Sequence, residues 1–442
     1  MSSLMYLIVM AIVFLKIKRI SRFYVFFLAT EYFYILGLGV YPLLLSVGVF
    51  DIHYDYGAYS NILDVSFLTP IHIIFCGIGA FLGAYSISLS GYFSSRFVQI
   101  AKLLYLSPLF ILSCLCFFVF IPFFLLVIKF GFAELITSAS LRRSGAFDFS
   151  EGLGGLSFFI KFITLGLFMV VVYPYYLLEG RNLFKVSFLI VTVGLIVYMV
   201  TASRFALFQS FVLLFLLYWS YNFRRFGVNF LAIFMTFLVL FILIYGKVFV
   251  SAVGAYISEG EWIELTYSFD FSSLMMHFGH LFYSIDAGVR NFSIAGPYIA
   301  KDILLSPLGV LPSGVFEKFG LSDFSYQFLD KESRSACVNT SNLGVEGQCY
   351  VPPYYTGISA YAFPVLGGFV FAYFRFLMYF SIARAWARLE FKSEGFKYIP
   401  LLLIFFFFIE QLMLFIPNSI SLMIFFALIT LVSRFFISTL RA

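Results

Sequence analysis

The stretch YMVTASRFALF, residues 198–208, joins two long apolar runs through a turn of only a few residues. Apolar runs of about 18 residues or more recur along the whole chain, and this is the length that a helix needs to cross a bilayer. Of the 442 residues, 62% are hydrophobic and only 11% are charged, which leaves too little polar surface for a soluble domain of this size. The runs are continuous rather than alternating, which argues against a transmembrane barrel. The sequence therefore predicts an all-α, polytopic integral membrane protein.

We expect about eleven transmembrane helices from the apolar runs. Their expected ranges are 3–15, 24–49, 67–89, 103–129, 158–178, 186–201, 206–221, 228–248, 360–383, 398–416 and 419–436. These helices imply three segments along the chain: 1–248 with an outer loop at 131–157, a large outer loop at 249–358, and 359–442. No basic region precedes the first apolar run, which argues against a cleaved signal peptide.

The orientation follows from the distribution of lysine and arginine, which favour cytoplasmic loops. If the N-terminus lies outside, most of the short loops that face the cytoplasm are basic. With eleven spans, the C-terminus then lies on the cytoplasmic side. These loops hold Lys16, Lys18, Arg19, Arg22, Arg96, Lys102, Arg181, Lys185, Arg224, Arg225, Arg384, Arg388, Lys392, Lys397, Arg434 and Arg441. The opposite orientation would place most of these residues outside.

Arg204, in the opening stretch, then lies on the outer side, where the positive-inside rule disfavours it. One interpretation is a snorkelling arginine that binds any lipid phosphate. The other is an arginine directed at a phosphate of a lipid-linked substrate, because a guanidinium matches phosphate oxygens and stays charged.

The outer loop at 131–157 carries a second pair of cations, Arg142 and Arg143, followed by a glycine-rich segment. Glycine gives flexibility or lets backbone approach a ligand closely. The pair is either a solvated charge pair or a clamp for phosphate or sugar. The glycines do not have Walker spacing, so this is not a nucleotide loop.

The large outer loop contains a run of polar residues spaced by three and four positions, which places them on one face of a helix. They are Thr266, Asp270, Ser273, His277, His280 and Ser284. We expect an interfacial helix across the mouth of the membrane domain, with this polar stripe facing a cavity or water. Arg290 follows shortly after.

Three interpretations of His277 and His280 stay open. They could be part of a water-facing stripe, a general base oriented by a carboxylate, or metal ligands. No further cysteine or histidine set accompanies them, so we expect no metal site. His53 and His72 lack a comparable constellation and are interpreted as structural.

A second amphipathic segment at 297–320 is also expected to pack on the membrane surface, broken by its prolines. Cys337 and Cys349 lie in the same polar outer loop, where the simplest expectation is a disulfide. The remaining cysteines lie in apolar runs and are expected to be inert thiols. They are Cys76, Cys114 and Cys116.

Charged residues within the predicted spans are few. Glu31 and Glu410 are intramembrane acids, which are candidates for function by default but can also be hydrogen-bonded structural groups. Arg375 lies nearer the inner end of its helix, where it can snorkel.

Many helices, outer arginines and one large late outer loop resemble the bacterial O-antigen and capsular polysaccharide polymerases, the Wzy family. TASRFALFQSF (201–211) is similar to the small-Ser-Arg segment after a mid-chain helix in that family. YYTGISAYAFPVLGGFVFAYFRF (354–376) is similar to the segment that leaves the large loop. Arg143 and Gly154 have the Arg-x10-Gly spacing found in outer loops of some members. The resemblance covers the whole topology but rests on short motifs.

The resemblance implies a GT-C-like architecture and an enzyme of the bacterial inner membrane, with a periplasmic N-terminus and a cytoplasmic C-terminus. Such an enzyme joins undecaprenyl-pyrophosphate-linked oligosaccharide repeat units on the periplasmic face. Cations would stabilise charge on the leaving pyrophosphate, a role for Arg142, Arg143, Arg204 and Arg290. A base would assist the attacking hydroxyl, a role for His277 or His280, with Asp270 and Glu410 as rivals. Neither a metal nor another cofactor is expected.

The partners that this function implies are the lipid-linked oligosaccharide, membrane lipids, a chain-length regulator and a flippase, with no nucleic acid. One alternative is an O-antigen ligase, which shares the architecture and differs in its acceptor. A different class is a flippase or other transporter, for which we find no clear internal repeat. A membrane scaffold without activity is the third alternative.

Overall fold

The computed structural model describes residues 1–21, 23–49, 65–103, 116–132, 192–196, 271–305, 335–344 and 353–390, with isolated positions at 135, 256, 318, 398 and 402. The regular elements in these ranges are helices, and no strand occurs among them. The predicted all-α class is therefore confirmed for the described part of the chain. Most of the spans predicted between 158 and 248, and both of those after 397, lie outside it.

The chain divides into two units. Unit 1 comprises Met1–Ile100, Phe271–Arg388 and Phe405–Ala442, and unit 2 comprises Ala101–Asp270 and Leu389–Ile404. In unit 2 the structure describes a π-helical turn, η3 (Cys116–Phe120), that leads directly into α7 (Ile121–Phe130). The remaining elements belong to unit 1, and they position the candidate site.

Helix α1 (Ser2–Ile20) is longer than the range 3–15 predicted for it. It continues through Lys16, Lys18 and Arg19 because nothing in this basic stretch breaks a helix, and basic residues suit the C-terminal end of a helix. Its buried residues recur every three or four positions, which marks one packed face. Its exposed face is also apolar, with Leu4, Ile8, Ile12 and Leu15. The helix is therefore largely apolar on its exposed face as well as on its packed one.

The predicted span 24–49 is a continuous helical path with a π-helical segment in its middle. It consists of α2 (Tyr24–Tyr34), η1 (Ile35–Val40) and α3 (Tyr41–Ser46). The predicted span 67–89 corresponds to α4 (Leu68–Tyr85). A further helix, α5 (Ile87–Leu103), follows Ser86, where the sequence led us to expect a basic inner loop.

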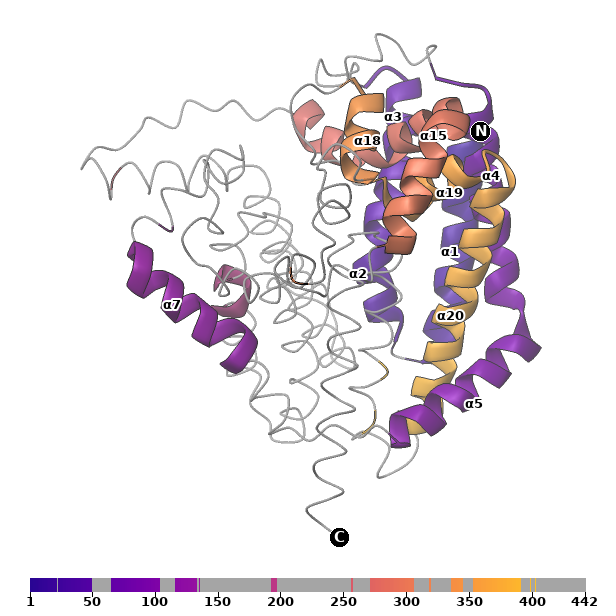
Figure 1. The fold of residues 1–442 in the computed structure, drawn as a ribbon. Helices are drawn as coiled ribbons and strands as arrows, with labels where there is room; N and C mark the ends of the chain where they lie inside the picture. The colour runs from indigo at the N-terminus through magenta and orange to yellow at the C-terminus, as the bar shows by residue number, and fades with distance from the viewer. Residues whose placement is uncertain are drawn as a thin grey trace. The chain divides into compact units, whose positions relative to one another are not determined.

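Helices α1 and α4 run in the same direction along each other (Figure 1). Tyr6 of α1 lies beside Gly77 of α4, and Lys16 lies over the ring of Tyr85, 3.1 Å from its centroid. The C-terminal ends of both helices therefore lie at the same end of unit 1.

Helix α20 (Leu366–Glu390) also runs in the direction of α4 and packs tightly on it. A Cβ at Gly79 would collide with the carbonyl oxygen of Phe369, and one at Gly83 would collide with that of Tyr373. The two glycines are four residues apart, the small-residue spacing that lets membrane helices approach closely. Helix α2 runs opposite to α20, since Phe23 contacts Trp386, at a centroid distance of 5.9 Å, while Glu31 pairs with Arg375.

Two described helices are long and apolar enough to cross a membrane, Leu68–Tyr85 and Leu366–Leu389. The C-terminal ends of α1 and α20 carry cations, and we call this the basic end of unit 1. It comprises Lys16, Lys18, Arg19, Arg384 and Arg388.

Helix α15 (Phe271–Leu305) joins the two amphipathic segments predicted in the large outer loop. It turns at Asn291, where φ is −111° and ψ is 18°, and it continues through Pro297. Every residue from 281 to 289 is buried, and this part packs against η1, α3, α4, α18 (Ser335–Asn342) and α19 (Tyr354–Ala362). The expectation of an interfacial helix is therefore wrong for residues 281–285, and the expectation that 297–320 packs on the membrane surface stays a prediction. The buried part of α15 forms the core at the end of unit 1 opposite the basic end.

Candidate functional site

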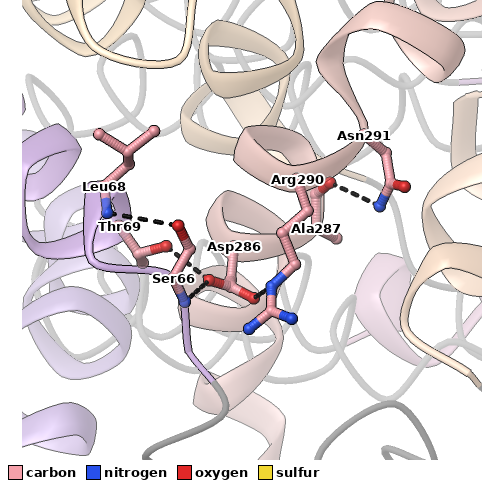
Figure 2. A network of polar contacts seen from close by, with 7 residues as sticks. All are labelled: Ser66, Leu68, Thr69, Asp286, Ala287, Arg290 and Asn291. Atoms are coloured by element: carbon pink, nitrogen blue, oxygen red, sulfur yellow. Dashed lines mark hydrogen bonds and ion pairs between the residues drawn. The ribbon is translucent and has the colours of Figure 1, made fainter.

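Asp286 and Arg290 of α15 form an ion pair one helical turn apart, in which Arg290 Nε lies 2.6 Å from Asp286 Oδ2 (Figure 2). The carboxylate is fully buried, whereas 41% of the arginine side chain is exposed. Opposite charges at this helical spacing attract each other. Asp286 is anchored inside the protein, whereas Arg290 extends from it toward the surface.

The second oxygen of Asp286 holds the beginning of α4. It accepts hydrogen bonds from the backbone N–H of Ser66, at 2.6 Å, and from the hydroxyl of Thr69, at 2.7 Å. The N-cap residue Phe67 has no capping side chain, but the hydroxyl of Ser66 accepts from the backbone N–H of Leu68 at 3.3 Å, and Asp286 holds Ser66 in this position (Figure 2). The negative charge of Asp286 also suits a helix N-terminus. Asp286 therefore connects α15 to one end of a candidate span.

The backbone bends directly after Arg290. The side-chain amide of Asn291 donates to the carbonyl oxygen of Ala287 at 3.0 Å, in the turn that precedes the bend (Figure 2). Beyond the bend, α15 exposes Phe292, Ile294 and Tyr298, while Ala295 and Ile299 stay buried. Arg290 thus lies where α15 changes from a core helix into an amphipathic one.

This arrangement can hold an anion beside an apolar surface. A guanidinium stays charged, and its planar group of donors matches the oxygens of a phosphate. The buried carboxylate restricts the arginine to one position, which reduces the entropy that binding costs. The neighbouring Phe292 and Ile294 are about half to three-quarters exposed, at 46% and 72%, and they would suit the apolar part of an amphiphilic ligand.

The polar stripe predicted on this helix does not face water along its whole length. Ser284 is fully buried, and its hydroxyl accepts a hydrogen bond from Asn339 of α18 at 2.9 Å. The hydroxyl of Tyr361 donates to Asn339 at 3.1 Å and accepts from Asn342 at 3.0 Å. These contacts join α15, α18 and α19, so the expectation that the stripe faces a cavity or water is wrong at Ser284. His280, one turn earlier, is half-buried.

The other predicted site residues are placed only in part. His277 belongs to α15, but its side chain is not among those described. Cys337 in α18 is disulfide-bonded, and the pairing with Cys349 stays a prediction because position 349 is outside the described residues. The remaining predicted site residues also lie outside them: Arg142, Arg143, Arg204, Asp270 and Glu410.

A second buried ion pair lies deeper in unit 1. Arg375 Nη2 is 2.5 Å from Glu31 Oε1, and both side chains are fully buried. The guanidinium carbon lies 4.4, 4.5 and 5.0 Å from the ring centroids of Tyr34, Tyr355 and Tyr379. The interpretation that Arg375 can snorkel is wrong, because its charge is balanced within the protein. The geometry supports the structural interpretation of Glu31.

His72 is structural, as predicted. Its Nδ1 lies 2.6 Å from the carbonyl oxygen of Pro364, and its Nε2 lies 3.0 Å from the hydroxyl of Ser359. It ties α4 to the connection between α19 and α20. His53 lies outside the described residues. Within the part of the chain that the structure describes, no three histidine, cysteine or acidic side chains gather as a metal site would require.

Known proteins give no family for this chain. No family model matches it, and comparisons with curated proteins and with solved structures yield no significant match.

Asp286, Ser66 and Thr69 were not predicted as site residues from the sequence. The acid and the arginine at positions 286 and 290 have the spacing of a helical ion pair, and this signal could have indicated that Arg290 is a positioned cation. Ser66 and Thr69 give no local signal, because their role depends on the packing of α15 against the start of α4.

Proposed function

We propose that this chain is a membrane glycosyltransferase that joins undecaprenyl-pyrophosphate-linked oligosaccharide repeat units into a surface polysaccharide. The observation that carries the proposal is Arg290, a partly exposed guanidinium held by the buried Asp286 at the start of α4. A phosphate on a lipid is the ligand that best suits a fixed cation beside exposed apolar side chains at the end of a candidate span.

The charge distribution of unit 1 supports an outer location for Arg290. Helices α1, α4 and α20 run in one direction and end at or near the basic end, whereas Arg290 lies at their opposite ends. Because basic residues favour the cytoplasmic side, the basic end would face the cytoplasm. The start of α4 would then face the periplasm, where lipid-linked repeat units are joined. The disulfide-bonded Cys337 also suits an oxidising compartment.

In the proposed reaction, a hydroxyl at the non-reducing end of one repeat unit attacks the anomeric carbon of the growing chain. A glycosidic bond forms, and the bond from that carbon to the pyrophosphate oxygen breaks. The hydroxyl proton passes to a base, and the lipid pyrophosphate leaves with its negative charge. Arg290 would stabilise this charge as it develops. His277, His280, Asp270 and Glu410 stay the candidates for the base.

The test is to delete the gene in its host, to complement it with variants, and to separate the surface polysaccharide by gel electrophoresis. We expect the deletion strain to carry lipid A core capped with one repeat unit. Arg290→Ala should be present in the membrane and should not restore long chains. Lys301→Ala is the matched control, since Lys301 is an exposed cation further along the same helix. Arg204→Ala and His277→Ala test the two other predicted roles in parallel.

The other functions give different products. If the lipid A core carries no repeat unit and long chains stay on the carrier lipid, the protein is a ligase. Repeat units trapped on the cytoplasmic side would identify a flippase. Full activity of Arg290→Ala would remove the observation on which the proposal rests, and an unchanged polysaccharide in the deletion strain would contradict the proposal as a whole.

A further inference from the structure

Helix α5 crosses the C-terminal end of α20 and is held there by two arginines (Figure 1). Arg384 donates a hydrogen bond to the carbonyl oxygen of Ile87 at 2.7 Å, and Arg388 donates one to the hydroxyl of Ser95 at 2.6 Å. These contacts attach α5 to the basic end of unit 1. The helix is therefore a fixed element at this end rather than a connecting loop.

The exposed side of α5 mixes apolar and polar side chains. Leu89, Tyr92 and Ile100 are exposed by 47%, 57% and 38%, next to the exposed Arg96 and Gln99. A helix in water exposes mainly polar side chains. The exposed side of α5 therefore suits the boundary between lipid headgroups and hydrocarbon.

A cation lies among these exposed apolar residues. Leu89, Tyr92, Arg96 and Ile100 recur at steps of three, four and four, which places them on one face. The Arg96 guanidinium is directed along this face, because it donates to the Tyr92 hydroxyl at 3.4 Å and to Gln99 Oε1 at 3.3 Å. An arginine among apolar side chains can reach the phosphates of a membrane while its aliphatic part and its neighbours contact hydrocarbon.

The surroundings add positive charge. Lys18, Arg19 and Arg388 are exposed at the basic end, and the acid Glu390 is the last residue of α20. Glu31 and Asp286 each pair with an arginine elsewhere in unit 1. Cations therefore outnumber acids among the described residues at this end, and charge complementarity favours an anionic partner.

We propose that α5 and the basic end form a docking surface for anionic phospholipids. Leu89, Tyr92 and Ile100 enter the upper acyl region, and Arg96 contacts the phosphates together with the cations of the basic end. This inference does not depend on the enzymatic function, because it concerns the opposite end of unit 1 from Arg290.

The first test measures lipid retention by the full chain, purified in a non-ionic detergent, with native mass spectrometry. Phosphatidylglycerol and phosphatidylcholine are added in equal amounts, and we expect the protein to retain the anionic lipid preferentially. Arg96→Gln should lower this preference about fivefold, and adding Arg388→Gln should lower it by a similar factor again. Lys301→Gln, which removes an exposed cation of α15, should leave it unchanged. Equal retention of both lipids, or an unchanged preference in the double variant, would overturn the proposal.

The second test measures the depth of α5 in reconstituted vesicles and does not depend on headgroup preference. A nitroxide is attached to Leu89→Cys in a chain that carries Cys114→Ser and Cys116→Ser. Leu89 is exposed, so the substitution should not disturb folding. We expect the nitroxide to collide more often with oxygen than with a water-soluble nickel chelate. The opposite ratio would mean that this face lies in water or is covered by a protein, and the proposal would be wrong.

Discussion

At Asp286, one carboxylate receives three donors: the Ser66 N–H, the Thr69 hydroxyl and Arg290 Nε. A buried carboxylate is tolerated only when its lone pairs are satisfied in this way. The same group therefore anchors the start of α4 and fixes the arginine. Asp286 contributes both to the stability of the protein and to the placement of Arg290, whereas Arg290 is held without anchoring α4. Substitutions at the two residues should therefore have different effects.

We predict that Asp286→Asn destabilises the protein by about 2 kcal/mol, because the amide nitrogen would confront donors that now bind a carboxylate. Arg290→Gln should cost less, because Asp286 keeps its bonds to Ser66 and Thr69 and Arg290 is partly exposed. Thermal unfolding of the purified variants in detergent measures both effects. A larger loss for Arg290→Gln than for Asp286→Asn would contradict this division of roles.

The Glu31–Arg375 pair gives a second prediction at the scale of the residue. Removing one charge leaves the other buried without its partner, which typically costs about 3–5 kcal/mol. We therefore expect Arg375→Met and Glu31→Leu each to lower the unfolding temperature strongly. The double variant should recover most of the loss, because an apolar pair replaces an ionic one. Additive losses in the double variant would show that the two residues do not act as a pair.

The sequence predicted Arg290 as a cation of the site, but it could not predict which groups hold it. The spacing of Asp286 and Arg290 is local and visible, whereas Ser66 lies 220 positions away along the chain. Arg375 was misjudged for the same reason. Its partner Glu31 belongs to another helix, and its tyrosine neighbours come from three separate elements.

At the scale of the helix, apolar runs indicated α1, α4 and α20 correctly but not where they end. The charges that closed the predicted range of α1 continue its helix, and the charged stretch after α4 forms α5. Charge indicates which side of a membrane a segment faces, and it does not by itself break a helix. The burial of α15 was also not visible in the sequence, because Ser284 is paired with Asn339 of α18 and Asp286 with the start of α4 rather than with water.

The contact between α4 and α20 gives a prediction at this scale. Gly83→Leu places a side chain against the backbone of Tyr373, where the main chain cannot yield easily. We expect a loss of about 1–3 kcal/mol from the forced separation of the helices. Leu82→Val is the matched control, since Leu82 is 43% exposed on the same helix. An unfolding temperature of Gly83→Leu equal to that of the control would mean that the two helices do not pack as closely as described.

At the scale of the molecule, the direction of the helices divides unit 1 into two chemically different ends. Three helices run together, so cations that are far apart in the sequence gather at one end, and Asp286 with Arg290 lies at the other. The predicted orientation came from loop charges, and the packing of α1, α4 and α20 brings five of the same cations to one end, while the orientation itself stays a prediction. If these helices span a membrane, the two ends must face different compartments.

This consequence can be tested by introducing one cysteine at a time into a chain that carries Cys114→Ser and Cys116→Ser. Ser293→Cys lies beyond the bend of α15, and Gln99→Cys lies on α5; both positions are exposed. A membrane-impermeant maleimide, applied to cells whose outer membrane alone has been opened, should label Ser293→Cys. It should label Gln99→Cys only after the inner membrane is also opened, because that cysteine would face the cytoplasm. The reverse pattern would invert the orientation and move Arg290 to the cytoplasmic side, where it could not act on periplasmic repeat units. Equal labelling of both positions before the inner membrane is opened would mean that unit 1 does not separate two compartments.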